Sequence, residues 1–374
     1  MKHRCEPRSS ASMSSIHEPT DEILRLLLAR LVGGAAFDED RLVRRLEALG
    51  PVDVDALAFA AAANRFDPTV GFLLAGTPLK DRIPESIRRR FEPAWRHHRL
   101  RNRTLVAMAD RVFAALEAAG ERPILFKGIH YVDWLSPDLG ARVLQDLDLV
   151  MPGANRDRCV EALKPLGFEP IDEPESDAIH LRHRLGIEID LHHRFRIFEC
   201  LEGELTVGHM PDHGPAQPWR VFGRTPELAT LIHHHCGPHM EVEGTRLCWL
   251  ADLALRLQVA DIESTEQVFR LVEEPRRLER LGWMLDLFER DLGLSLPRWR
   301  DAVPTPRSPA RWSTAMASTR MLPMGLPRPL GWARWIAAAR PAWRTRWGPR
   351  PSLADLRRLR EVWRCLGRPA VGAA

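Results

Sequence analysis

Residues 124–128 read Ile-Leu-Phe-Lys-Gly, residues 146–149 read Asp-Leu-Asp-Leu, and residues 188–192 read Glu-Ile-Asp-Leu-His. The first stretch is an apolar run of strand length that ends in Lys-Gly and leads into a helical pattern. The other two alternate acidic and apolar residues with a period of two, which places them on opposite faces of a strand. These stretches predict a small sheet that carries carboxylates on one face.

The third stretch is predicted to form one arm of an antiparallel hairpin. Segments 178–185 and 187–195 flank a single glycine, an arrangement typical of a hairpin turn. Glu188, Asp190 and His192 would then share one face, opposite the apolar side chains of the same strand. The partner strand contributes His180 and His183, which are weaker candidates for a functional role than His192.

This residue pattern suits phosphate chemistry that depends on divalent cations. Asp146 and Asp148 project to the same side of one strand, and Asp190 from a neighbouring strand can complete an oxygen cage for Mg²⁺. A pair of such ions lowers the pKa of an attacking hydroxyl and neutralises triphosphate oxygens. The Lys127-Gly128 turn offers backbone N–H groups to phosphate, and Lys127 or Arg142 adds a positive charge.

In these segments the chain resembles a bacterial family of uncharacterised nucleotidyltransferases within the DNA polymerase β superfamily. The segments that carry the resemblance are Phe126-Lys127-Gly128, Arg142, Asp146-Leu147-Asp148-Leu149, Gly167-Phe168 and Asp190-Leu191-His192. The similarity extends over about residues 90–260 and includes Trp249-Leu-Ala-Asp252. It implies an α+β fold, in which a small mixed sheet of polymerase β type is flanked by N- and C-terminal helical regions.

The resemblance also implies roles for individual residues. Asp146, Asp148 and Asp190 would be catalytic and would hold two Mg²⁺ ions, while Lys127, Gly128 and Arg142 would lie near the triphosphate of an NTP co-substrate. From its place in the sequence, His192 would hold a carboxylate or assist proton removal from the acceptor, and Tyr131 would lie beside the nucleotide. The phosphate turn departs from the superfamily, because Ile129 follows Lys127-Gly128 where Gly-Gly or Gly-Ser is usual.

Helical periodicity surrounds the predicted sheet on both sides. A long amphipathic helix is expected over 84–119, and 3.6-residue periodicity continues through 265–292. The predicted parts are a disordered N-terminus (1–20), an N-terminal helical domain (21–120), a nucleotidyltransferase-like core (121–218), a C-terminal helical region (219–296) and a basic tail rich in Pro, Trp and Arg with short helices (297–374).

Composition argues against a membrane-spanning protein, and the cysteines and one histidine-rich run need separate interpretation. No run reaches the roughly 18 to 20 apolar residues of a membrane span, and no apolar segment follows the basic N-terminus, so we expect a cytoplasmic protein without a membrane contact. The six cysteines form no Cys-x-x-Cys pair and are expected to be reduced packing residues. The run 233–236 with His239 invites a zinc site, although Gly237-Pro238 breaks the helix that such a site would need.

The net charge of +4 hides a basic C-terminal segment, since residues 297–374 hold 16 arginines and three acidic residues. This tail would either contact RNA or another polyanion, through residues such as Arg334 and Arg340, or form a helical cap packed by tryptophans.

We expect an enzyme that transfers an NMP from an NTP to a hydroxyl of a peptide, a small metabolite or a protein. The alternatives are an inactive scaffold that keeps the fold, or an RNA-directed transferase of the tRNA or toxin type.

Overall fold

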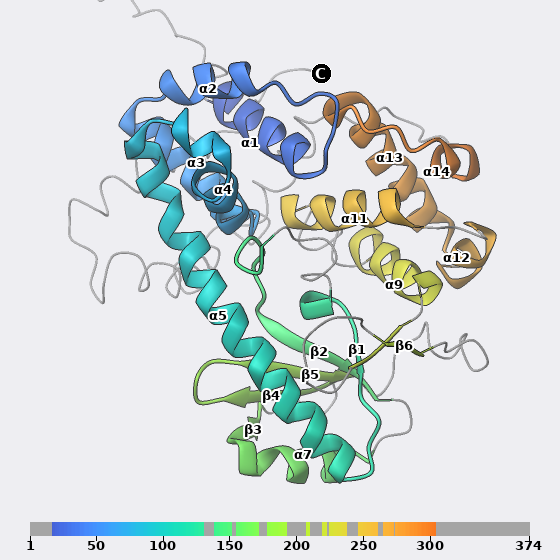
Figure 1. Ribbon diagram of the computed structural model, residues 1–374. Coiled ribbons are helices and arrows are strands. Elements are labelled where there is room, and N and C mark those ends of the chain that lie inside the picture. Colours follow the sequence, from blue (N-terminus) through green and yellow to red (C-terminus); the bar gives the residue numbers. More distant parts are fainter. Residues whose placement is uncertain are drawn as a thin grey trace, which may run out of the picture.

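The computed structural model describes residues 17–130, 138–151, 155–171, 178–192, 207–209, 219–222, 224–237, 246–260, 265–272 and 274–303. Helices from both ends of the chain form one layer, and a mixed sheet lies beside them (Figure 1). The α+β class, with a small mixed sheet flanked by helical regions, is therefore confirmed.

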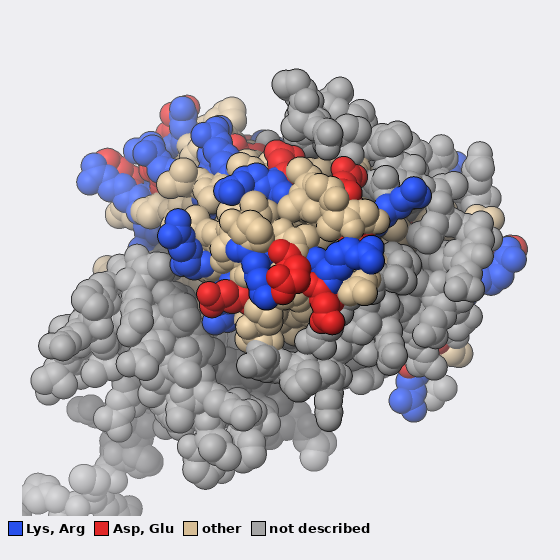
Figure 2. Space-filling view, turned by 90° about the horizontal axis from the view of Figure 1, so that it is seen from below, with Lys and Arg blue, Asp and Glu red and all other residues tan. Residues whose placement is uncertain are grey.

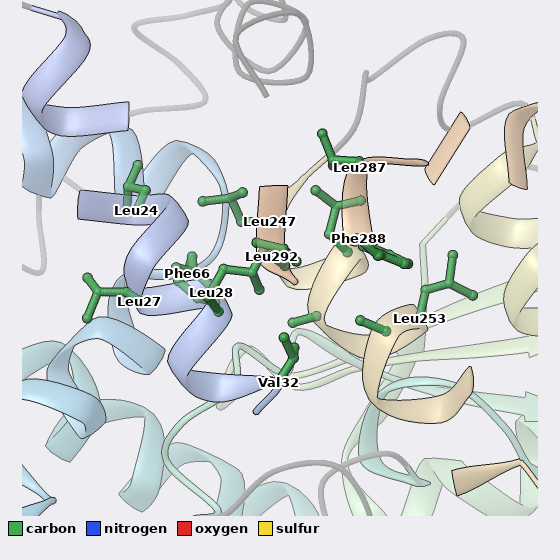
Figure 3. Packing of buried hydrophobic residues seen from close by; sticks show 14 of the residues in the cluster. Leu24, Leu27, Leu28, Val32, Phe66, Leu247, Leu253, Leu287, Phe288 and Leu292 are labelled. Carbon is green, nitrogen blue, oxygen red and sulfur yellow. The ribbon is translucent and has the colours of Figure 1, made fainter. Parts of the chain in front are cut away.

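The helices before the sheet and those after it share one hydrophobic core. Before the sheet these are α1 (His17–Leu31), α2 (Glu39–Glu47), α3 (Pro51–Ala63), α4 (Asp67–Ala75) and α5 (Glu85–Ala118), with a 3₁₀ turn η2 (Pro78–Asp81). After it come α9 (Arg224–Cys236), α11 (Leu247–Val259), α12 (Thr265–Val272), α13 (Pro275–Leu292) and α14 (Pro297–Ala302). Leucines of α1 pack against side chains of α11 and α13 (Figure 3). The two helical regions, which lie far apart in the sequence, thus stabilise each other.

The sheet has seven strands in the order β3-β4-β5-β2-β1-β7-β6. Their bounds are β1 (Ile124–Leu125), β2 (Asp146–Val150), β3 (Phe168–Pro170), β4 (Ala178–His183), β5 (Glu188–His192), β6 (Val207–His209) and β7 (Arg220–Phe222). The β4–β5 pair is antiparallel, as the sequence predicts for the hairpin, and the neighbouring β2–β5 pair is parallel. Helix α7 (Arg156–Leu163) and the 3₁₀ turn η3 (Lys164–Leu166) separate β2 from β3.

Helix α5 connects the helical layer to the sheet. Its first half contributes Ile87 and Phe91 to the helical core, and its second half lays a stripe that includes Leu105, Val112 and Leu116 on the apolar face of the sheet. In Figure 1 this helix runs alongside both layers. It ends just before Gly120, whose φ of +81° suits the termination of a helix, as the sequence predicts.

The same helix holds the segment that leads into β2. Asn102, which is fully buried, donates from Nδ2 to the carbonyls of Leu139 and Arg142 at 2.6 and 2.9 Å. A side chain at Gly140 would meet the Trp95 carbonyl at 2.7 Å, so the segment lies against the helix backbone. These contacts fix the chain directly before the acidic strand.

Two expectations about local structure need correction, and a third lies mostly outside the described residues. Helix α1 begins at His17, inside the segment 1–20 that was expected to be disordered, since Pro19 is tolerated in a first helical turn. The periodicity over 265–292 is divided into two helices, because Pro275 starts α13 and cannot continue a helix from α12. Most of the tail, including all but the start of the segment where short helices were expected, lies outside the described residues, but Trp299 is buried and its indole donates to the Leu257 carbonyl at 3.1 Å.

No helix in the described ranges combines the length and apolarity that a bilayer crossing requires.

Three cysteines, Cys159, Cys236 and Cys248, are buried free thiols. Burial raises their pKa values to about 11, 12 and 11, so these thiols stay protonated. They serve as packing residues, as expected.

We predict that Asn102→Ala destabilises the protein by about 1 to 3 kcal/mol, because two buried carbonyls lose their donor. Arg103→Ala is the matched control on the same helix, since Arg103 is exposed, and it should change stability by no more than about 0.5 kcal/mol. Urea unfolding of both variants measures the difference. Equal stability of the two variants would contradict the role given to Asn102.

Candidate active site

The acidic residues lie close together because β2 and β5 are neighbouring parallel strands whose register aligns their acidic positions. Asp148 lies directly opposite Asp190, and Asp146 lies opposite Glu188. Since side chains alternate along a strand, Asp146, Asp148 and Asp190 share one face of the sheet. The opposite face carries the leucines and isoleucines that pack under α5 and α7.

A compact group of possible metal ligands lies at the centre of this face. Ligand atoms of Asp148, Asp190 and His192 all lie within 4.8 Å of one another. His192 Nε2 is 3.2 Å from Asp148 Oδ1, and His180 Nδ1 on β4 is 2.7 Å from Asp190 Oδ1. Each of the two central carboxylates therefore has its own histidine.

The crowded carboxylates influence one another electrostatically. Burial, followed by the charges of Asp148 and Asp190, raises the pKa of Asp146 from 3.8 to about 7. Burial also acts to raise the pKa of Asp148, but the Lys127 ammonium and His192 outweigh it and hold this pKa below its ordinary value. A face with this excess of carboxylate oxygens fits a hard divalent cation, whose charge would remove the repulsion.

The turn after β1 brings the predicted phosphate-binding residues to the same place. Lys127 has a φ of +53°, in the left-handed region that side chains disfavour, and Gly128 follows with +26°. Lys127 Nζ lies 3.4 Å from Asp148 Oδ1, and a helix begins at Gly128. The strained turn thus aims one ammonium group at the acidic face.

Arg142 connects this turn to the helical layer. Its Nη1 donates to the Gly128 carbonyl at 2.9 Å, and its Nε donates to Asp252 Oδ1 on α11 at 2.9 Å, with a second bond from Nη2 to Asp252 Oδ2. The predicted contact of Arg142 with the triphosphate stays a prediction, because its guanidinium binds protein groups here.

Six of the residues singled out in the sequence lie close together in the structure, while their roles stay predictions, and the sequence analysis misses other residues nearby. The residues that converge are Asp146, Asp148, Asp190, His192, Lys127 and Gly128. Tyr131 lies outside the described residues. His180, a weaker candidate from the sequence, bonds to Asp190, and Arg65 in the turn after α3 opposes the rise in the Asp146 pKa by its charge. The φ of +52° at Arg65 is not visible in the sequence.

The histidine run of α9 has contacts that differ from those of a metal site. His233 bonds to Arg277, and His235 is buried with its ring stacked on Trp249 at a centroid distance of 5.5 Å. His239 lies outside the described residues. These contacts make His233 and His235 packing residues of the helical layer.

A protein surface that binds a polyanion such as RNA is expected to carry a continuous group of basic side chains. Figure 2 shows basic and acidic side chains of the described residues intermingled there. The described part of that face therefore presents no continuous basic surface. The arginines expected to contact RNA, Arg334 and Arg340 among them, lie outside the described residues.

This geometry agrees with a family assignment. The chain belongs to the family described as uncharacterised nucleotidyltransferase, whose profile matches residues 50–292, more than half of the chain. The match is wider than the 90–260 expected and takes in helices on both sides of the sheet. A search of curated proteins finds no match.

Solved structures give weaker similarities. The antibiotic-resistance factor ANT(2'')-Ia matches with 13% identity, covering 54% of this chain and 91% of the other, at a TM-score of 0.28. ANT(2'')-Ia in complex with adenylyl-2''-tobramycin matches with 16% identity, 42% and 99% coverage and a TM-score of 0.27. An antigenic nucleotidyltransferase-like protein from Paracoccidioides brasiliensis matches with 16% identity, 52% and 93% coverage and a TM-score of 0.34. Similarities at this level do not bear on individual residues of this site.

We predict that Asp146→Asn stabilises the metal-free protein at pH 8 by roughly 1 to 3 kcal/mol. The fold favours the protonated form of Asp146, so the stability of the wild type falls as the pH rises from about 4 through about 7. Thermal unfolding in EDTA at pH 5 and pH 8 measures this, and the difference should shrink at pH 5. The control is Asp157→Asn at an exposed position of α7. A variant that is no more stable than wild type at pH 8 would argue against a crowded carboxylate.

Proposed function

We propose that this chain is a metal-dependent nucleotidyltransferase that transfers an NMP from an NTP to a hydroxyl group of an acceptor. The observation that supports the proposal best is the close placement of Asp148, Asp190 and His192 on one sheet face, beside the Lys127-Gly128 turn. Family membership points in the same direction. The acceptor would be a peptide, a small metabolite or a protein.

In this proposal Asp146, Asp148 and Asp190 would hold two Mg²⁺ ions, with His192 orienting Asp148. Such ions, when bound, supply charge neutralisation at the triphosphate and a lowered pKa of the attacking hydroxyl. The Lys127 ammonium would move from Asp148 to a phosphate oxygen of the nucleotide. Backbone N–H groups at the start of the helix at Gly128 would donate hydrogen bonds to other phosphate oxygens.

The reaction is an in-line displacement at the α-phosphorus. A bond forms between the acceptor oxygen and this phosphorus, the bond to the bridging α,β-oxygen breaks, and pyrophosphate leaves. Asp190 would accept the proton of the acceptor hydroxyl, while His180, 2.7 Å away, orients the carboxylate. The protein's further contribution is alignment of the acceptor within about 3.5 Å of phosphorus.

Calorimetric titration of ATP, GTP, CTP and UTP tests whether the fold binds nucleotide. We expect binding of at least one NTP in the presence of Mg²⁺ and none in EDTA. A metal-independent signal, or none at all, would favour the alternative of an inactive scaffold.

Incubation with α-labelled NTP and separate pools of peptides, small molecules, proteins and RNA then identifies the acceptor class. Label in a peptide, metabolite or protein pool supports the proposal. Label in RNA alone would support the RNA-directed alternative in its place.

Asp148→Asn should lower the rate of NMP transfer by on the order of a hundredfold or more, because a central carboxylate of the metal site is lost. Glu169→Gln, at an exposed position on the edge strand β3, is the control and should keep the wild-type rate. Initial rates at saturating Mg²⁺ and NTP measure both. A fully active Asp148→Asn protein would refute the assigned metal site.

A further inference from the structure

Two buried polar bridges connect the Lys127-Gly128 turn to a single face of α11. The first runs from the Gly128 carbonyl through Arg142 to Asp252. The second is the salt bridge between Glu227 on α9 and Arg256, at 2.6 Å, and Glu227 Oε1 lies 3.2 Å from His130 Nε2 without hydrogen-bond geometry. We call these five residues the turn anchor: Arg142, Asp252, His130, Glu227 and Arg256.

Both bridges end on the same side of α11. Asp252 and Arg256 are four residues apart, so they lie on the same side of the helix, one turn from each other. The side chains of Glu227 and Arg256 are 3% and 1% exposed, and that of Asp252 is 5% exposed. The bridges are therefore shielded from water.

Such bridges are a costly way to gain stability. Removing charges from water carries a desolvation penalty that often exceeds their attraction, and apolar residues of similar size commonly do as well. What a bidentate pair supplies instead is a fixed position and direction. Stability alone therefore gives no reason to bury ionic groups at this place.

The turn itself needs external support. The positive φ of Lys127 is a strained conformation for a residue with a side chain, and such strain persists only where the surroundings enforce it. The turn anchor bonds the chain at Gly128, directly after the strained residue, and contacts it again at His130. Lys127 Nζ is thereby kept at the acidic face.

We infer that Asp252 and Glu227 are positioning residues, which hold the turn that receives the nucleotide phosphates by way of Arg142 and His130. Arg142 then acts on the nucleotide through the backbone of Gly128. The inference rests on the proposed function for the identity of the ligand, whereas the position of the turn can be measured without any ligand.

Hydrogen exchange of the metal-free, nucleotide-free protein tests the anchor directly. In Asp252→Asn, amides of residues 127–130 should exchange about tenfold faster or more than in wild type, because the turn opens locally. The control is Glu22→Gln, which breaks another buried carboxylate–arginine contact, made with Arg41 and Arg45 of α2. Helices α1 and α2, which carry these residues, lie in the part of the helical layer away from the sheet (Figure 1). Equal exchange at 127–130 in both variants would overturn the inference.

NTP affinity supplies a second readout that a merely structural role would not move. Asp252→Asn should weaken Mg²⁺–NTP binding about tenfold or more, while Glu22→Gln should leave it unchanged even if its melting temperature falls. Arg142→Gln combined with Asp252→Asn should bind no more weakly than Arg142→Gln alone, because both changes release the same bridge. Additive losses, with normal exchange at 127–130, would show that Arg142 and Asp252 act independently and would overturn the inference.

The two readouts also separate this inference from the proposed function. Faster exchange at 127–130 in Asp252→Asn supports the anchor even if wild-type protein binds no NTP, an outcome that would refute only the proposed function. NTP binding by wild type with unchanged exchange and affinity in Asp252→Asn would refute only the anchor.

Discussion

The site depends first on the parallel pairing of β2 with β5. This pairing places Asp148 opposite Asp190 across one step of the sheet, at a spacing that regular strand hydrogen bonding dictates. A register shift by one residue would turn the acidic side chains of one strand into the apolar core under α5 and α7. The same burial that stabilises the sheet thus enforces the convergence of the carboxylates, and no separate interaction is needed to bring them together.

Convergence of carboxylates has an electrostatic cost that the rest of the face reduces. Lys127 and His192 both approach the same oxygen of Asp148, and His180 bonds to Asp190. Asp146 has weaker compensation and retains a raised pKa. The protein's own positive and hydrogen-bonding groups therefore offset part of the repulsion, and a bound cation would offset the remainder. The remaining repulsion among the carboxylates favours cation binding, because a bound cation would relieve it.

Local pattern was enough to predict the acidic face but not the support behind it. Alternation along 146–149 and 188–192, with a glycine in the hairpin, is a short-range signal, and strand pairing converts it into geometry. The partners of Arg142 are different, since Asp252 lies 110 residues further along the chain. Only the unusual presence of an acid in the apolar helix α11 hints that it is paired. The positive φ of Arg65 and of Lys127 likewise follows from packing, because neither residue type favours it.

The two halves of the site therefore depend on different physical causes. Strand register fixes the carboxylates, whereas side chains from the helical layer support the Lys127-Gly128 turn. Helix α11 can serve as that support because it is itself held firmly: its leucines lie in the shared helical core, and buried Asn64 accepts a hydrogen bond from the Leu247 N–H at its start. Since α3 and α13 also contribute to that core, helices near both ends of the matched region help to hold α11. The family profile likewise extends over 50–292, although the acidic motifs occupy a short central part of the chain.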